Sequence, residues 1–357
     1  MAGRFLTLAL SLTLVAAAAA CSQPEPEAQP AAAGEGLVLA EETHLANATQ
    51  LTFSGQNAEA YFSFDGGHLS FQSTGEYACD QIYTMDIDGS NRMLISAGQG
   101  RTTCSHFTPD GSEIVYASTY LGGLECPPEP GFEQGYVWPV YDSYDIFKVA
   151  ADGSNPVRLT DTPGYDAEAT IGPDGTIVFT SVRDGDMEIY SMGADGSNVR
   201  RLTNLPGPDG GPFFSADGSK IVFRGRHPEL GSPELDDYFR LLAEGLWRPT
   251  SLELYVMDPD GSNLQQVTNL NGASFAPFFT PDAQQIIFST NHHDPAGREF
   301  DLFLVNVDGS GLEQVTFSPE FDGFPMFSPD GTKLVFASNR NAAVAGETNV
   351  FLADWNR

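Results

Sequence analysis

The sequence has little positive charge. Lysine and arginine together number 17, against 48 aspartates and glutamates, which gives a formal net charge of −31 over 357 residues. A surface this negative repels phosphate backbones and anionic lipid headgroups. We therefore expect no nucleic-acid binding, and we expect a charged partner to be a protein or peptide with a cationic surface.

Histidine and cysteine are also scarce, with six and four residues respectively. Few histidines limit the sites at which a transition metal could bind. The G-x-S-x-G motif of serine hydrolases does not occur in the sequence, which argues against that class of enzyme.

Long hydrophobic runs are missing except at the start of the chain. The segment "FLTLALSLTLVAAAAA" follows Arg4 and ends just before Cys21. It is too short for a confident membrane span and ends in small residues, as secretory signals do. We predict that residues 1–20 are a signal peptide and that Cys21 is the lipid-modified first residue of a bacterial lipoprotein. Ordinary cleavage near Ala20 is the alternative.

A segment rich in proline, alanine and glutamate follows the predicted signal. Residues 21–35 contain almost nothing that could be buried, so they are predicted to form a flexible tether. The folded domain is predicted to span residues 36–357 and to be a monomer. The tether would hold it on the periplasmic side of the cell envelope, anchored to the outer or inner membrane.

After the tether, an Asp-Gly turn recurs along the chain. It occurs in "FSFDGG", "FTPDGS", "IGPDGT", "FSADGS" and "FSPDGT", and a variant copy reads "FTPDAQ". The copies are about 45 residues apart, with two intervals longer by about 20, and 40–45 residues is typical of propeller blades. Alternating apolar segments flank each copy, so each copy predicts a β-hairpin.

A third and a fourth strand follow each hairpin. Segments such as "EIYSMGADGSN" predict the third strand and a second Asp-Gly turn, and a segment ending in "LT" or "VT" predicts the fourth. Four antiparallel strands make one blade of a β-propeller. The sixth unit stops after three strands, and "HLANATQLT" at the N-terminus supplies a matching fourth. We therefore predict an all-β, six-bladed propeller of four-stranded blades, closed by the N-terminal strand, which leaves no open sheet edge.

These repeats resemble the WD-like β-propeller repeats of the TolB family. The family pattern is an F-S-P-D-G-x-x-I-x-F-x-S hairpin followed by I-Y-x-M-x-x-D-G-S, and the resemblance covers about residues 44–355. TolB also has an N-terminal α/β domain, for which the sequence shows no counterpart. The resemblance implies a periplasmic, protein-binding module.

Two insertions account for the long intervals between repeats. Residues 119–144 and 227–253 are both predicted on the face opposite the Asp-Gly turns, which we call the top face. Insertions gathered on one face of a repeat protein often mark its binding face, and a purely structural lid is the alternative. The second insertion predicts a short helix, with Ser232 as N-cap and Pro233 in the first turn. An apolar stripe is expected to pack it onto the blades: Leu235, Phe239, Leu242 and Leu246.

Polar residues are predicted around the top face and the pore mouth. They form the candidate binding set: Glu59, His106, Asp166, Glu168, Arg183, Asp186, Asp209, His293, Asp322 and Arg340. Carboxylates from several blades would converge there and could bind a basic peptide. A Ca²⁺ ion on Asp166, Glu168 and Asp322 is the weaker option, and hydrogen bonding within the fold is the structural one. No other cofactor is expected.

An enzymatic function is the alternative to a binding module. A metal-dependent hydrolase or lyase would have its site in the pore and would use histidines and carboxylates. The candidates are His106, Glu168, Asp322 and His293.

Three cysteines remain besides Cys21, and an oxidising compartment permits one disulfide. Cys104 begins an inner strand and Cys126 lies in the loop beside it, so we predict that these two pair. A Cys79–Cys104 pair is the rival.

Overall fold

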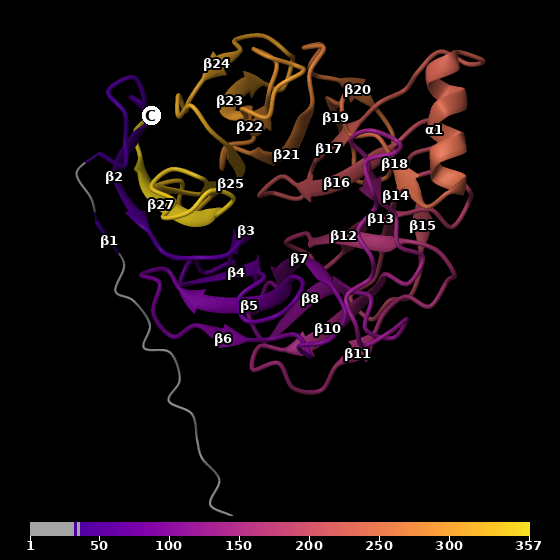
Figure 1. Cartoon of the computed structure of the whole chain (residues 1–357), viewed down its shortest axis with the longest axis horizontal. Helices are drawn as coiled ribbons and strands as arrows, with labels where there is room; N and C mark the ends of the chain where they lie inside the picture. Colours follow the sequence, from indigo (N-terminus) through magenta and orange to yellow (C-terminus); the bar gives the residue numbers. More distant parts are fainter. Residues whose placement is uncertain (1–31, 34–35) are drawn as a thin grey trace, which may run out of the picture.

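The computed structural model describes residues 32–33 and 36–357. In this part of the chain, six antiparallel sheets surround a central axis, and one end strand of each sheet lies innermost (Figure 1). The predicted six-bladed, all-β propeller is therefore confirmed. The predicted signal peptide, Cys21 and nearly all of the predicted tether lie outside the described residues. Across the described ranges, no helix is both long and apolar enough to cross a membrane.

Blades I to III follow one another along the chain, each from its inner to its outer strand. Blade I contains β3 (Asn57–Phe62), β4 (His68–Ser73), β5 (Gln81–Asp86) and β6 (Met93–Leu94). Blade II contains β7 (Thr102–Phe107), β8 (Glu113–Ser118), β10 (Asp145–Ala150) and β11 (Val157–Arg158). Blade III contains β12 (Asp166–Ile171), β13 (Ile177–Ser181), β14 (Glu188–Met192) and β15 (Arg200–Arg201).

Blades IV to VI repeat the same order. Blade IV contains β16 (Asp209–Phe214), β17 (Ile221–Gly225), β19 (Glu253–Met257) and β20 (Gln265–Gln266). Blade V contains β21 (Ser274–Phe279), β22 (Gln285–Thr290), β23 (Asp301–Asn306) and β24 (Glu313–Gln314). Blade VI contains β25 (Asp322–Phe327), β26 (Lys333–Ser338) and β27 (Asn349–Trp355), and is completed by β2 (Leu45–Gln50).

The N-terminal strand closes the ring. β2 pairs antiparallel with β27, with Leu45 opposite Trp355 and Gln50 opposite Phe351. The short β1 (Ala32–Ala33) pairs in turn with β2, so the sheet of blade VI has a fifth strand. The predicted closure by an N-terminal strand is confirmed, and it joins the two ends of the described chain in one sheet.

An aromatic pair joins the second and third strands of every blade. In blade I, Phe71 of β4 lies directly opposite Tyr83 of β5, with ring centroids 5.8 Å apart. The other five pairs are Tyr116–Phe147, Phe179–Tyr190, Phe223–Tyr255, Phe288–Phe303 and Phe336–Phe351. Directly opposed aromatic side chains stabilise a sheet by roughly 0.2–1 kcal/mol per pair. The repeated apolar segments of the sequence therefore form the core between the blades.

The Asp-Gly turns lie together on one face, as predicted. The Asp110 carboxylate accepts hydrogen bonds from Thr108 Oγ1 (2.8 Å) and the Ser112 backbone amide (3.1 Å), and Gly111 has φ of 70°. The two turns of a blade are neighbours, since the Ile87 amide donates to the Gly67 carbonyl at 3.3 Å. The opposite face therefore carries the connections between blades and both insertions.

Each inner strand contains a β-bulge. The pairing with the second strand shifts register at this point, and the bulged residue has a positive φ, for example 52° at Glu59 and 56° at Glu168. We call the six equivalent bulged residues the pore ring: Glu59, Cys104, Glu168, Gly211, Ala276 and Phe324. A bulge redirects side chains, and a non-glycine residue with positive φ costs on the order of 1 kcal/mol or more. Because each residue is the third of its inner strand, the ring lies near the top face.

Candidate functional site on the top face

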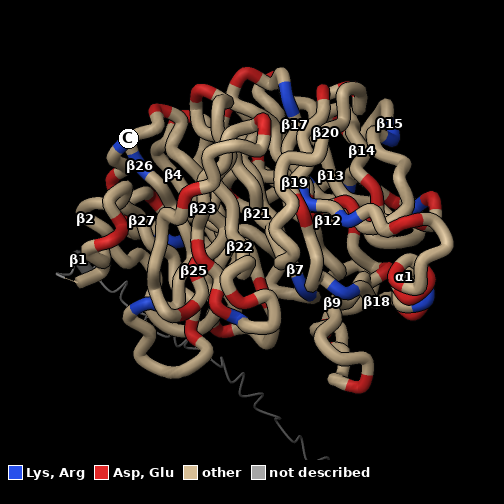
Figure 2. The backbone as a smooth tube through the Cα atoms, turned by 90° about the horizontal axis from the view of Figure 1, so that it is seen from above, with Lys and Arg blue, Asp and Glu red and all other residues tan. Residues whose placement is uncertain are grey.

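The two insertions pair with each other. β9 (Trp138–Pro139) of the first insertion and β18 (Leu246–Trp247) of the second form a two-stranded antiparallel sheet. Below it, Trp247 packs in one apolar cluster with Met187 of blade III. The insertions of blades II and IV therefore meet above blade III, and Figure 2 shows β9, β18 and α1 (Pro233–Ala243) together on one side of the propeller.

The predicted helix is confirmed as α1, with Ser232 as its N-cap accepting a hydrogen bond from the Leu235 amide at 3.3 Å. The predicted apolar stripe is partly wrong. The buried residues of the helix are Leu235, Tyr238 and Leu241, whereas Phe239 is 38% exposed. Tyr238 takes the inner face because its hydroxyl has a buried partner, Asp186.

Asp186 anchors the second insertion to blade III. Its Oδ1 accepts hydrogen bonds from the Tyr238 hydroxyl at 2.6 Å and from the Met187 amide at 2.8 Å, and its Oδ2 accepts from the Gly207 amide at 3.1 Å. Burial raises the pKa of Asp186 even though these donors oppose the shift. Among the predicted binding residues, Asp186 is therefore the one that positions the insertion.

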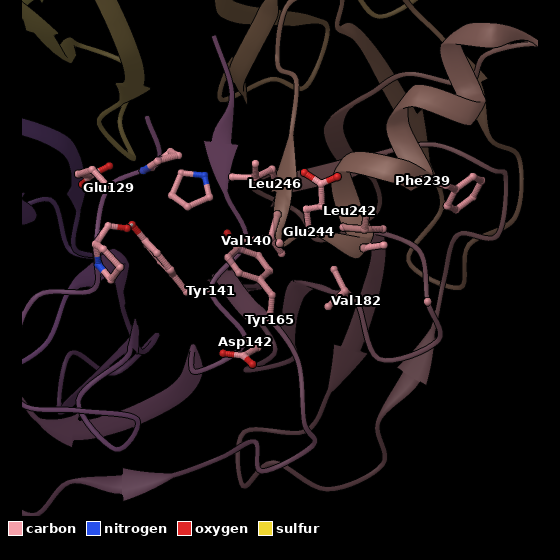
Figure 3. Close-up of a pocket in the computed structure, with 16 residues that line it drawn as sticks. Glu129, Val140, Tyr141, Asp142, Tyr165, Val182, Phe239, Leu242, Glu244 and Leu246 are labelled. Atoms are coloured by element: carbon pink, nitrogen blue, oxygen red, sulfur yellow. The ribbon is translucent and has the colours of Figure 1, made fainter. Parts of the chain in front are cut away.

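A cleft of about 780 Å³ lies between the insertions. Its apolar walls come from Val140, Tyr141, Tyr165 and Val182 on one side and from Phe239, Leu242 and Leu246 on the other (Figure 3). Three acidic residues also line it: Glu129, Asp142 and Glu244. Glu129 pairs with Arg101, and Glu244 pairs with Arg240 at 3.1 Å, while Asp142 is exposed and has no ion-pair partner among the described residues. The cleft can therefore accept apolar side chains next to a cationic one.

Two predicted acidic residues belong to the pore ring. Glu168 Oε1 accepts from Arg224 Nη2 at 2.6 Å, and its Oε2 accepts from the Gly211 amide at 2.8 Å. Arg224 and these hydrogen bonds lower the pKa of Glu168, although burial acts in the opposite direction. Glu59 accepts from the Cys104 amide at 3.1 Å. Burial, together with the charge of Glu168, raises the pKa of Glu59 to about 7.

Aromatic side chains lie beneath the ring. Tyr61, His106, Phe213 and Phe278 occupy equivalent positions two residues further along their inner strands. The Tyr61 and Phe213 rings are 5.3 Å apart, and those of Phe213 and Phe278 are 5.5 Å apart. Burial lowers the pKa of His106 to about 4, so it is neutral at physiological pH. These residues form a largely apolar floor below the pore mouth.

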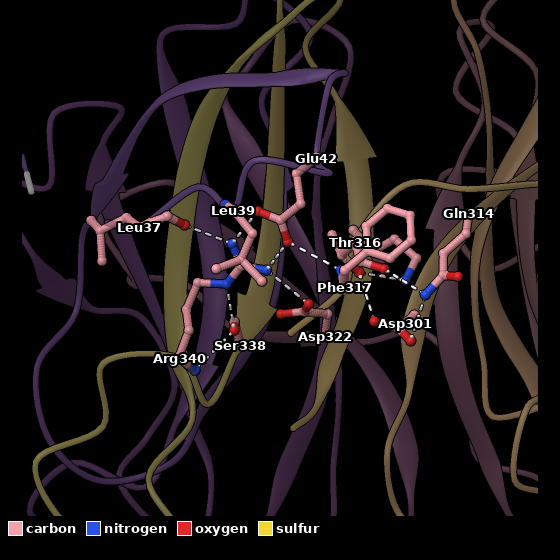
Figure 4. A network of polar contacts seen from close by, with 11 residues as sticks. Leu37, Leu39, Glu42, Asp301, Gln314, Thr316, Phe317, Asp322, Ser338 and Arg340 are labelled. Atoms are coloured by element: carbon pink, nitrogen blue, oxygen red, sulfur yellow. Dashed lines mark hydrogen bonds and ion pairs between the residues drawn. The ribbon is translucent and has the colours of Figure 1, made fainter. Parts of the chain in front are cut away.

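Three other predicted carboxylates are paired within their own blades. Asp166 binds Arg183 at 2.9 Å, and Asp209 binds His227 at 2.9 Å. Arg340 donates to Asp322 at 2.8 Å, to Glu42 at 2.9 Å and to the Leu37 carbonyl at 2.7 Å (Figure 4). These contacts hold the start of the inner strands of blades III, IV and VI and, in blade VI, also the segment that precedes β2. This is the structural role considered for them from the sequence.

The metal-site candidates do not form one cluster. Asp166, Glu168 and Asp322 pair with three different arginines, and His293 lies in an exposed turn beside His292, their rings 4.4 Å apart. No group of three or more His, Cys, Asp or Glu side chains within the described residues is arranged to hold a metal ion. The contacts of these residues therefore give no support to a metal site, and calcium binding stays a prediction.

Both cysteine pairings considered from the sequence are wrong. The disulfide joins Cys79 and Cys126, whose Cα atoms are 5.9 Å apart, and Cys104 is a buried free thiol. The bulge at Cys104 places this residue in the pore ring, where it meets Glu59 instead of the loops. Cys79 lies in the loop between β4 and β5, so the disulfide ties blade I to the first insertion.

Several residues of the site are missing from the sequence-based set. Arg224 reaches Glu168 because Gly211 leaves room: a Cβ at that glycine would lie 2.3 Å from Arg224 Nη1. The adjacent glycines at 210 and 211 are the only signal for this contact in the sequence. Tyr238 and the pair Trp138–Trp247 had no signal except that each lies in an insertion.

The fold and the top face define a β-propeller with one elaborated face. Residues 232–356 match the family model of the TolB beta propeller domain, so the resemblance to TolB-type repeats is confirmed for this part of the chain. No curated protein matches the sequence.

Solved structures show the same fold at low identity. A putative TolB from Agrobacterium tumefaciens is 18% identical with a TM-score of 0.55, and the match covers 85% of this chain and 91% of that one. A gluconolactonase from Xanthomonas campestris is 13% identical with a TM-score of 0.58, covering 92% and 95%. An oligogalacturonate lyase in complex with manganese is 14% identical with a TM-score of 0.52, covering 87% and 94%. Because a TolB and two different enzymes share this fold, these matches establish the architecture alone.

Proposed function

We propose that the protein is a lipid-anchored propeller on the periplasmic side of the bacterial cell envelope, and that it binds a partner protein through its top face. The main support for this proposal is the cleft of about 780 Å³ between the two insertions. Blade III has a short connection where blades II and IV carry insertions, so a stable blade does not require them. Insertions that pair with each other above one blade support a role in binding.

The chemistry of the cleft supports a peptide segment as the ligand. Tyr141, Tyr165 and Leu246 offer apolar surface, and Asp142 offers a carboxylate that has no ion-pair partner in the described part of the chain. Aromatic walls and a few placed polar groups are typical of recognition sites. The net charge of −31 favours a cationic partner and accelerates its approach. The TolB-type repeats support a protein-binding role in the periplasm.

Site-specific photo-crosslinking in cells tests this proposal. A photoreactive residue would replace Phe239 or Ala243 in the cleft and, as a control, Ser112 in an Asp-Gly turn on the opposite face. We expect the two cleft positions to capture the same protein and the control position not to capture it. Asp142→Lys should reduce capture from position 239. Capture that is equal from both faces would contradict the proposal.

A metal-dependent hydrolase or lyase is the second candidate. Its predicted residues, His106, Glu168, Asp322 and His293, are dispersed among the pore floor, two separate ion pairs and an exposed turn. No specific contact in the described residues favours it over a binding module. Elemental analysis of the purified protein before and after a chelator tests it directly.

A further inference from the structure

The pore ring is chemically divided. Its six residues occupy equivalent positions in six similar blades, so they lie at one level of the pore. Blades I to III contribute Glu59, Cys104 and Glu168, whereas blades IV to VI contribute Gly211, Ala276 and Phe324. Glycine is the unstrained residue at such a position, and blade IV has it. The other five positions hold a side chain at a conformational cost that glycine would avoid, and two of these side chains are the carboxylates of Glu59 and Glu168.

Glu59 has no cationic partner among the described residues. Its Oε2 accepts hydrogen bonds from the Cys104 amide at 3.1 Å and from Thr103 Oγ1 at 3.5 Å. Glu59 remains partly accessible to solvent. Its burial is nevertheless sufficient to raise its pKa to about 7. A positive charge brought close to this carboxyl group would favour its ionised form, which burial disfavours.

Arg224 reduces the charge of the ring. Its side chain is only 8% exposed, and its guanidinium lies against the bulge of blade IV, where Nη2 donates to Glu168. Its Nε is buried without a partner within the described residues. Because Arg224 neutralises Glu168, the ring retains one negative charge, that of ionised Glu59. A single charge suits a monovalent cation and is too little for Ca²⁺, which usually takes several carboxylates.

We propose that the pore mouth binds one organic cation, an ammonium or guanidinium group on a short aliphatic chain, with Glu59 as its counter-ion. The charged group would lie between Glu59 and Glu168. The chain would lie against Phe324, which is next to Glu59 and opposite Glu168 in the ring, and above the Tyr61 and Phe213 rings, which offer apolar surface and aromatic faces. The cation could belong to a free amine or to a basic side chain of a bound protein, because both share this chemistry. Binding of a protein side chain rests on the proposed function.

The site adjoins the cleft. Tyr165 lines the cleft and lies one residue before β12, the strand that holds Glu168. The Cζ atom of Arg224 is 5.5 Å from the ring centroid of Trp247, a residue of the strand pair that joins the two insertions. A peptide bound in the cleft could therefore place a lysine or arginine side chain in the pore mouth.

Calorimetric titration of the full mature chain tests the proposal. The probes are n-butylammonium and the blocked tripeptide Gly-Lys-Gly, with Gly-norleucine-Gly as the uncharged match, all at an ionic strength of about 0.15 M to screen weak surface binding. The variant is Glu59→Gln, which keeps the acceptor for the Cys104 amide, and the control is Glu229→Gln, an exposed glutamate of the second insertion. We expect Glu59→Gln to weaken binding about ten- to a hundredfold, as for loss of a hydrogen bond to a charged group.

The pH dependence supplies a second readout. Below pH 7 a cation must displace a proton from Glu59, so affinity should fall about tenfold per pH unit below that point. The wild type should show this loss, and Glu59→Gln should not. Carbon NMR of the Glu59 carboxyl should report a lower pKa when n-butylammonium is added.

The titration distinguishes the two sources of the cation. Binding of both charged probes supports a site for free amines and for side chains, and binding of the lysine peptide alone supports a site for side chains. Absence of binding by either charged probe, equal affinity for the norleucine peptide, or binding unchanged by Glu59→Gln overturns the proposal. Since n-butylammonium requires no partner protein, this result is independent of the crosslinking result for the cleft.

Discussion

Trp138 and Trp247, which are 109 positions apart in the sequence, lie directly opposite each other in the β9–β18 pairing. Their ring centroids are 5.7 Å apart and the planes are nearly perpendicular, at 88°. Trp247 is 3% exposed, it belongs to the same apolar cluster as Met187 of blade III, and its ring faces the guanidinium of Arg224. One buried side chain thus connects both insertions, the blade below them and the pore mouth.

Trp247→Ala should destabilise the protein by roughly 3–5 kcal/mol, since a large buried aromatic side chain leaves a cavity. Because the insertions lose their common contact, crosslinking from position 239 should also decline. Urea unfolding followed by fluorescence measures the stability change. Phe239→Ala is the matched control on the exposed side of the same insertion and should cost less than about 1 kcal/mol. A similar loss in both variants would show that Trp247 is not the organising contact.

Arg340→Ala should be more destabilising than Arg183→Ala. Arg340 is the counter-ion of two carboxylates, Glu42 and Asp322, whose side chains are both 0% exposed. Removal of one partner of a buried pair typically costs about 3–5 kcal/mol. Arg183 pairs with Asp166 in the equivalent place of blade III, and no second carboxylate among residues 36–357 pairs with it. The urea midpoint of Arg340→Ala should therefore be lower than that of Arg183→Ala. Equal midpoints would show that the contact between Arg340 and Glu42 adds no stability.

The repeated features of the fold could be predicted from the sequence. The Asp-Gly turns and the Phe71–Tyr83 type of pair recur once per blade, so one unit predicts the others. The orphan strand "HLANATQLT" could be assigned to blade VI because every other unit has four strands. Periodicity thus determined the number of blades, the closure and the face that carries the insertions.

The site could be predicted less well, because it depends on contacts that do not repeat. Asp166 and Asp322 resemble pore-facing acids in the sequence, yet each pairs with the arginine that follows the second strand of its blade. The sequence predicts that Cys104 meets the loop beside its strand, but the bulge at Cys104 changes the direction of its side chain, and Cys126 pairs with Cys79 instead. Contacts between the two insertions depend on their paths in space, for which the sequence has no repeat.

Removal of the Cys79–Cys126 disulfide should lower stability. It closes a loop of 47 residues, for which chain entropy predicts a loss of about 4 kcal/mol on reduction, and measured values are usually smaller. Cys79→Ser with Cys126→Ser should therefore lower the urea midpoint and accelerate proteolysis within residues 119–144. Cys104→Ala is the control, and it should leave proteolysis of that insertion unchanged. The native protein should contain one buried thiol in the described chain, which becomes reactive only on unfolding.

Stability should be greatest in mildly acidic solution, near pH 4–5. Burial, reinforced by the charges of Asp322 and Glu299, raises the pKa of Asp301 to about 7, and burial raises that of Glu188 to about 7. The ordinary values are 3.8 and 4.5. Between about pH 4 and 7 the folded protein therefore binds more protons than the unfolded chain, and the free energy of unfolding falls as the pH rises. The turn aspartates act in the opposite direction: hydrogen bonds from Ser328 and Thr332 lower the pKa of Asp330 to about 2, and this stabilisation is lost as the pH falls from 4 to 2.

Two substitutions separate these contributions. Asp301→Asn removes one of the raised groups, so the slope of unfolding free energy against pH between 5 and 7 should become shallower, by up to about 1.4 kcal/mol per pH unit. Asp330→Asn should leave that slope unchanged and flatten the curve below pH 4. Urea unfolding at a series of pH values measures both slopes. The net charge of −31 adds repulsion that also grows with pH, so only the difference between Asp301→Asn and the wild type isolates the buried carboxyl. An unchanged slope in Asp301→Asn would mean that Asp301 is ionised in the folded protein. Its hydrogen-bond donors in blade V, Gln314 and Thr316, would then stabilise the charge by more than burial destabilises it.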